Sequence, residues 1–137
     1  MSAGYSGTPL VRKLGFRPGW RVAALGAVPL NLDELLGELP PGVRIVRRLG
    51  DELDAAWIFV VSRRELERRV AEALPRLPPD GTLWISWPKR SSGVPSDLTE
   101  NVLREVVLPT GWVDIKVAAI DETWSGLRFA LRRAERR

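Results

Sequence analysis

Residues 81–101 read GTLWISWPKRSSGVPSDLTEN, and they combine an apolar run, a polar loop and the start of a helix. The run 82–87 is apolar on both faces, which is typical of a central strand in a parallel sheet that helices cover on both sides. Pro88 ends the run. We therefore predict a buried central strand with a loop at its carboxyl end.

The loop after this strand is a candidate site, because ligands in open parallel sheets bind beyond the carboxyl ends of the strands. Its cations, hydroxyls and glycine favour an oxyanion such as phosphate, sulfate or carboxylate. The candidate ligand-binding residues here are Trp87, Lys89, Arg90, Ser91, Ser92 and Asp97. The alternative is a solvated connection, because Ser, Gly and Pro are also the usual turn residues.

The composition limits the chemistry of this chain. Its 137 residues are the size of one domain, and they include no histidine and no cysteine. A Ser–His–Asp triad, a HExxH zinc site, disulfides and thiolate metal ligands are therefore excluded, and we predict no metal site. Acid–base chemistry would fall to residues such as Lys89, Asp97, Asp121 and Glu122.

The sequence also bears on location and partners. No apolar run is long enough to span a bilayer, and the start MSAGYSGTP lacks the features of a signal peptide, so we expect a cytoplasmic protein without a membrane partner. The net charge of +4 raises nucleic acid as a partner, through Arg47, Arg48 and the C-terminal arginines. Because the cations are dispersed and most tryptophans lie in apolar runs, we treat nucleic acid as a minor alternative. The scarcity of Asn and Gln is compatible with a heat-adapted bacterium, or with a GC-rich genome.

The rest of the chain alternates strands and helices. Apolar runs predict strands at 20–26, 43–48 and 55–61, and capping signals predict helices that begin at Thr8, Asn31, Ser62 and Asp97. The run 55–61 is the most hydrophobic and is expected in the middle of the sheet, whereas 43–48 alternates and is expected at an edge. Residues 1–7 are expected to form an N-terminal arm.

The C-terminal part predicts an antiparallel hairpin. Two alternating segments, 112–121 and 127–133, flank Ser125 and Gly126, which we place in the turn. The residues around this turn add Asp121, Glu122 and Trp124 to the ligand-binding candidates. The predicted architecture is a single α/β domain over residues 1–137, Rossmann-like, with a mostly parallel sheet and a C-terminal antiparallel hairpin.

This outline, together with LGFRPGWRV at 14–22, LDAAW at 53–57 and LPPDGTL at 77–83, resembles the S-adenosylmethionine (SAM)-dependent methyltransferase fold. The resemblance implies a glycine-rich loop after the first strand and a carboxylate after the second, which hold the cofactor. At those places this chain has LGAVPLN at 25–31 and the pair Arg47 and Arg48. Side-chain bulk and misplaced donors would weaken both contacts. We therefore predict that SAM is bound weakly or not at all, and that no cofactor is present.

The chain also resembles, nearly end to end, a bacterial family of short proteins defined as a domain of unknown function. The phrases that carry this resemblance are SAGYSGTPL at 2–10, WPK at 87–89, DLTE at 97–100 and DETWSGL at 121–127. It implies no activity. It does imply that the N-terminal arm, the loop after the central strand and the hairpin turn act together.

Three functions follow from the sequence. The leading hypothesis is a methyltransferase-like domain with a remodelled cofactor site, which binds an anionic small molecule or serves as an accessory module. The first alternative is a SAM-dependent methyltransferase that uses the polar residues of the loop and the hairpin turn. The second alternative is a nucleic-acid-binding protein.

Overall fold

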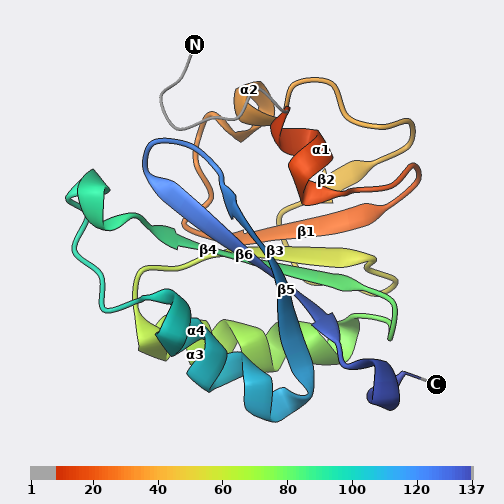
Figure 1. Ribbon diagram of the computed structural model, residues 1–137. Helices are drawn as coiled ribbons and strands as arrows, with labels where there is room; N and C mark the ends of the chain where they lie inside the picture. Colours follow the sequence, from red (N-terminus) through yellow and green to blue (C-terminus); the bar gives the residue numbers. More distant parts are fainter. Residues whose placement is uncertain (1–8, 137) are drawn as a thin grey trace.

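The computed structural model describes residues 9–136 and shows a sheet of six strands in the order β2-β1-β3-β4-β6-β5 (Figure 1). The strands are β1 (Arg21–Gly26), β2 (Arg44–Val46), β3 (Ala55–Phe59), β4 (Thr82–Pro88), β5 (Trp112–Ala119) and β6 (Trp124–Leu131). The strands β1 to β4 pair in parallel, whereas β6 pairs antiparallel with both β4 and β5. The predicted mostly parallel sheet with a C-terminal antiparallel hairpin is confirmed. The predicted arm at 1–7 and helix cap at Thr8 lie outside the described residues.

Helices cover both faces of the sheet, with α1 and α2 on one face and α3 and α4 on the other (Figure 1). The α-helices are α1 (Leu10–Leu14), α2 (Leu32–Leu36), α3 (Arg63–Ala73) and α4 (Glu100–Val107). Short 3-10 turns lie at η1 (Leu74–Arg76), η2 (Arg90–Ser92), η3 (Leu108–Thr110) and η4 (Arg133–Glu135). Within residues 9–136 no helix has the length and apolar character needed to cross a bilayer.

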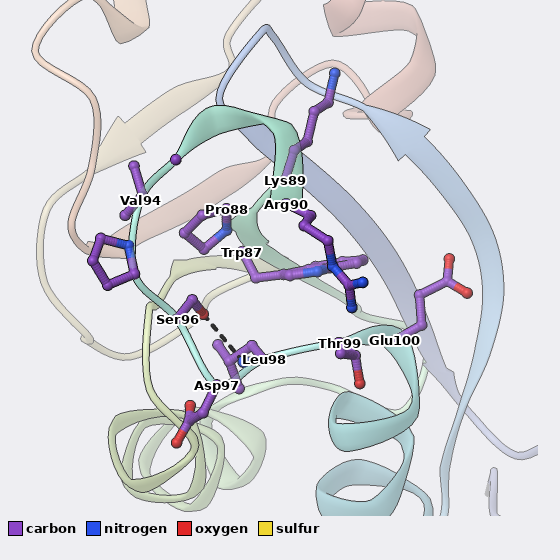
Figure 2. Close-up of a pocket in the computed structure, with 12 residues that line it drawn as sticks. Trp87, Pro88, Lys89, Arg90, Val94, Ser96, Asp97, Leu98, Thr99 and Glu100 are labelled. Carbon is purple, nitrogen blue, oxygen red and sulfur yellow. Dashed lines mark hydrogen bonds between the residues drawn. The ribbon is translucent and has the colours of Figure 1, made fainter.

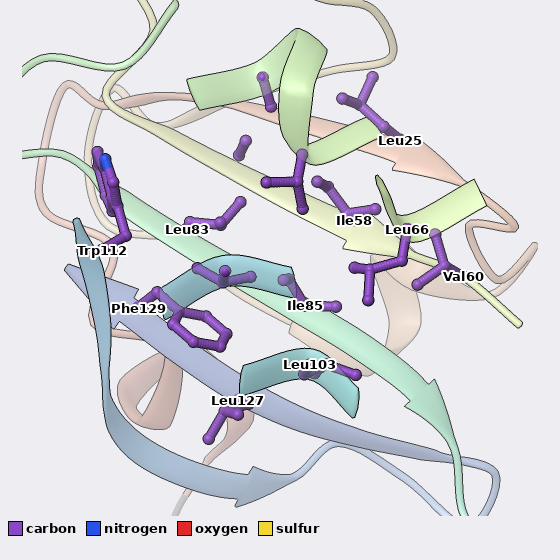
Figure 3. Packing of buried hydrophobic residues seen from close by; sticks show 14 of the residues in the cluster. Leu25, Ile58, Val60, Leu66, Leu83, Ile85, Leu103, Trp112, Leu127 and Phe129 are labelled. Atoms are coloured by element: carbon purple, nitrogen blue, oxygen red, sulfur yellow. The ribbon is translucent and has the colours of Figure 1, made fainter. Parts of the chain in front are cut away.

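The core lies on both sides of β3 and β4, in which every residue is buried. Side chains alternate along a strand. Ile58, Leu83 and Ile85 therefore face α3 and α4 (Figure 3), while Trp57 and Trp84 face α1 and α2. The predictions that these two strands are central and that β2 lies at an edge are confirmed.

The buried tryptophans also tie the sheet to its surroundings through hydrogen bonds. Trp57 Nε1 donates to Ser86 Oγ at 2.8 Å, which links β3 to β4. Trp84 Nε1 donates to the carbonyl oxygen of Leu14 at 2.9 Å, which fixes the end of α1 over the sheet. Both indole N–H groups are therefore satisfied in the core.

The helix starts agree only partly with the capping signals. Ser62 caps α3, because its Oγ accepts a hydrogen bond from the amide of Glu65 at 3.2 Å. The prediction that Asp97 caps the next helix is wrong, since Thr99 Oγ1 accepts from the amide of Val102 and α4 begins two residues later than expected. Asp97 Oδ1 instead accepts from the amide of Arg63 at 2.8 Å, at the start of the neighbouring helix.

The hairpin is antiparallel as predicted, but its turn is not at Ser125 and Gly126. These residues belong to β6, where they pair with Trp87 and Ser86 of β4. The chain reverses after Ile120, where Asp121 Oδ1 accepts hydrogen bonds from the amides of Thr123 and Trp124 at 2.8 and 2.7 Å. An aspartate that bonds the backbone two residues on stabilises such a turn.

Candidate functional site

The strands β1 and β3 end side by side, since Gly26 pairs with Phe59. The amide of Ala27 donates to the carbonyl oxygen of Phe59 at 2.9 Å. Gly26 has a φ of +89°, and a Cβ there would lie 2.2 Å from the same carbonyl oxygen. Only glycine allows the two strands to approach so closely. The backbone of Gly26 and Ala27 is exposed just beyond this contact.

The next two residues, Val28 and Pro29, do not cover Gly26 and Ala27. Val28 is half-buried and packs against the core beneath α1 and α2. Pro29 is half-buried as well. Gly26 and Ala27 are therefore exposed to a ligand, beside the Arg69 side chain, whose Nε would lie 3.3 Å from a Cβ at Gly26.

A cavity of about 570 Å³ lies beyond the carboxyl end of β4 (Figure 2). Its walls come from the end of β4, from η2 and from the extended segment 93–99 that leads into α4. Trp87, Pro88 and Leu98 are buried and supply apolar surface. The cavity is therefore lined by apolar and polar surface in similar amounts.

The acidic groups at the rim already have partners in the protein. Asp97 accepts from the amide of Arg63, and Glu100 forms an ion pair with Arg104 at 3.3 Å. Neither Lys89 nor Arg90 forms an ion pair within residues 9–136. Asp97 keeps its negative charge, because its partner is a neutral amide, so the cavity offers two cations, Lys89 and Arg90, and one carboxylate without an ion pair.

Figure 2 distinguishes these two cations. The side chain of Lys89 points away from Trp87 and Leu98, whereas Arg90 extends on the same side as the rest of the rim. Arg90 is exposed, and it begins the turn η2 directly after Lys89. Arg90 is therefore the better placed of the two to meet an anion in the cavity.

Arg63, at the start of α3, is committed to other contacts. Its guanidinium forms ion pairs with Glu105 at 2.7 Å and with Glu67 at 3.3 Å. The hydrogen bonds with Glu105 and then Glu67 raise the pKa of Arg63. This residue joins α3 to α4 and leaves no free charge for the cavity.

The structure brings together four of the predicted site residues and separates the rest. Trp87, Lys89, Arg90 and Asp97 line the cavity. Ser91 and Ser92 do not line it. Ser92 Oγ shapes the loop, because it donates to the carbonyl oxygen of Lys89 at 2.6 Å and accepts from the amide of Val94 at 3.2 Å.

The candidates from the hairpin turn do not line this cavity. Asp121 holds the turn, and Glu122 is exposed. Trp124 is buried against Phe59, with ring centroids 5.2 Å apart and perpendicular rings. The turn and the loop nevertheless touch, because the amide of Lys89 donates to the carbonyl oxygen of Thr123 at 2.7 Å.

Several residues that line the cavity were not among the candidates predicted from the sequence. They include Pro88, Val94, Pro95, Ser96, Leu98, Thr99 and Glu100. Ser96 holds the segment in place, since its Oγ donates to the carbonyl oxygen of Val61 at 2.7 Å. The available signal was the length of the segment without regular structure between η2 and α4.

No family model matches the sequence, and neither does any curated protein, so membership of the bacterial family of short proteins stays a prediction. Solved structures share the fold. A SAM-dependent methyltransferase from Aquifex aeolicus matches with a TM-score of 0.62 and 12% identity over 88% of this chain and 86% of that one. Fibrillarin from Aeropyrum pernix, with natively bound SAM, matches at 0.61 and 14% over 93% and 70%. TrmN from Thermus thermophilus matches at 0.57 and 16% over 89% and 47%, so this chain spans about half of its length.

The prediction of no cofactor is contradicted by these comparisons, because the matching structures include SAM-dependent methyltransferases and one of them holds SAM. Two physical arguments behind that prediction also fail. Val28 is turned toward the core, so its bulk does not block the backbone of Gly26 and Ala27. A ribose hydroxyl accepts hydrogen bonds as well as donating them, so arginine after β2 is compatible with a ribose.

Proposed function

We propose that this chain is a SAM-dependent methyltransferase domain that binds SAM at the adjoining ends of β1 and β3. The observation that carries this proposal is the exposed main-chain turn at Gly26 and Ala27, where a Cβ at Gly26 would collide with Phe59. The turn lies at the carboxyl edge of the sheet, where open α/β folds bind their ligands. The shared fold with SAM-dependent methyltransferases supports the same assignment.

The residues around this turn suit the chemistry of the cofactor. The backbone of Gly26 and Ala27 would hold the cofactor by close approach, and Arg47 and Arg48, both exposed after β2, would donate hydrogen bonds to its hydroxyl or carboxylate oxygens. When bound, SAM supplies a methyl group on a positively charged sulfur.

The cavity beyond β4 is the proposed place of the methyl acceptor. Its apolar surface at Trp87, Pro88 and Leu98 and its uncommitted cation Arg90 favour a small molecule with an apolar body and an anionic group. A domain that binds SAM and this ligand without methyl transfer would be a binding or accessory module. Once a natural ligand of the cavity has been identified, a methyl-transfer assay with that ligand distinguishes a methyltransferase from a binding or accessory module.

Nuclear magnetic resonance of the ¹⁵N-labelled protein tests the location of the cofactor. Addition of SAM should shift the amide signals of Gly26, Ala27 and Ser62 first, because these residues end β1 and follow β3. The amide of Gly111, which lies at the opposite end of the sheet before β5, should stay unchanged. Shifts confined to the opposite end would rule out the proposed site.

The acceptor cavity has its own test, with benzoate as a probe that joins an apolar ring to a carboxylate. Benzoate should shift the side-chain N–H signal of Trp87, and Arg90→Gln should weaken its binding about tenfold by removing a charge-assisted contact. The control is Arg12→Gln, an equal charge change at an exposed position of α1. Equal weakening by both substitutions would show a general charge effect and contradict the site.

A further inference from the structure

A second group of cations lies on the face of the sheet that carries α1. It consists of Arg17, in the loop between α1 and β1, Lys116 of β5 and Arg128 of β6. Lys116 and Arg128 are direct partners across the two antiparallel strands. Like charges in that position are destabilising, so this pairing opposes folding unless a counter-charge is present.

The described part of the protein supplies no such counter-charge. None of the three cations forms an ion pair within residues 9–136. Lys116 Nζ donates to the carbonyl oxygen of Lys13 at 2.8 Å, and Arg128 Nη2 donates to Thr82 Oγ1 at 3.2 Å. Neutral acceptors orient both cations but leave their charges uncompensated.

Arg128 is held in a partly enclosed position. Its Nε is buried and has no hydrogen-bond partner, and its Nη1 would lie 3.6 Å from a Cβ at Gly15. Burial, and then the nearby charge of Arg17, lower the pKa of Arg128. An anion that approaches a desolvated and repelled cation of this kind stabilises its charged form.

We propose that Arg17, Lys116 and Arg128 form a binding site for phosphate groups. Arginine presents a planar fork of N–H donors that matches phosphate oxygens, and lysine adds a compact charge beside it. The side chain of Arg128 is fixed by Thr82 and enclosed beside Gly15, so little conformational freedom is lost on binding. The site lies near the first residue of β4, away from the carboxyl edge, and does not depend on the proposed cofactor.

Calorimetric titration at low ionic strength tests this site, with inorganic pyrophosphate and a single-stranded RNA oligonucleotide as separate probes. At least one probe should bind to the wild-type protein. In a thermal-unfolding measurement the same probe should raise the melting temperature of the protein. Arg17→Gln and Lys116→Gln should each weaken that binding by about tenfold, because each removes a charge-assisted contact. Both positions are exposed, so neither change disturbs the core.

The matched control is Arg64→Gln, the same loss of charge at an exposed position of α3, on the opposite face of the sheet. It should change the affinity for either probe by less than about twofold. A tighter complex with pyrophosphate would identify a small phosphorylated molecule as the source of the phosphate, and a tighter complex with RNA would identify a phosphodiester backbone. Failure of both probes to bind, or equal losses in all three variants, would overturn the proposal.

Discussion

Ser86 is fully buried in the middle of β4, and its hydroxyl accepts the N–H group of Trp57. Ser86→Ala would leave that N–H group buried without a partner, which costs about 1–3 kcal/mol. We therefore expect the free energy of unfolding in urea to fall by this amount. The control is Ser91→Ala, at an exposed position, which should change it by about 0.5 kcal/mol or less. Equal effects would show that the Trp57 contact contributes nothing.

Gly26 combines a positive φ with a tight contact. In Gly26→Ala the new Cβ would meet the carbonyl oxygen of Phe59, and the backbone would have to move, so we expect a loss of about 3 kcal/mol or more in unfolding free energy. Gly19 has a φ of +81°, but a Cβ there would meet no atom within 4 Å. Gly19→Ala should therefore cost only the backbone strain, about 1–2 kcal/mol. A loss at Gly26 no larger than that at Gly19 would contradict the close approach of β1 and β3.

Single residues were predictable from sequence where burial decides their role. Trp57 and Trp84 lie in long apolar runs, and both are buried. The role of Asp97 was not predictable, because its carboxylate bonds a backbone N–H group that only the tertiary fold brings near it. For Asp97 that group is the amide of Arg63, which is distant in sequence.

At the scale of elements, the start of α4 provides a test of the corrected cap. Thr99→Ala removes the acceptor for the amide of Val102 and should lower the unfolding free energy by about 1 kcal/mol. Asp97→Ala should leave α4 intact. It should loosen the start of α3, where the backbone amide of Arg63 loses its acceptor. Amide hydrogen exchange reports the two helices separately. Faster exchange in α4 for Asp97→Ala, and not for Thr99→Ala, would restore Asp97 as the cap.

The hairpin shows why a turn can be predicted at the wrong residues. Ser and Gly are typical turn residues, and this preference favoured a turn at Ser125 and Gly126. In the structure Gly126 lies within β6, where a Cβ would come 2.9 Å from Ile120 Cδ1. Its small size serves the packing between β6 and Ile120, and this tertiary contact has no signature in the local sequence.

The edge strand β5 differs from expectation for a related reason. Ile115 and Val117 are 52% and 54% exposed, although they alternate as a half-buried strand would. The register shifts between Asp114 and Lys116, which indicates a bulge in β5. A bulge turns the side chains of the following residues, so alternation alone does not predict which face is covered.

At the scale of the whole molecule, the sequence predicted the fold class because buried parallel strands are long apolar runs that are recognisable one by one. The position of the candidate cavity also followed, since β4 ends at the carboxyl edge of the sheet. The expectation for the cofactor was wrong, because it rested on the size of Val28 without its direction. The direction of such a side chain depends on packing between segments that are distant in sequence, and no local sequence pattern specifies it.

Calorimetric titration with SAM tests the central claim most directly. Ala27 is exposed beside Gly26, so Ala27→Phe should obstruct the proposed contact surface without entering the core, whereas Ala134→Phe makes the same change at an exposed position near the C-terminus. We expect the wild-type protein and Ala134→Phe to bind SAM with a dissociation constant of about 100 μM or tighter. Ala27→Phe should bind at least about tenfold more weakly. Wild-type affinity weaker than about 1 mM, or equal affinity in both variants, would contradict a SAM site at the ends of β1 and β3.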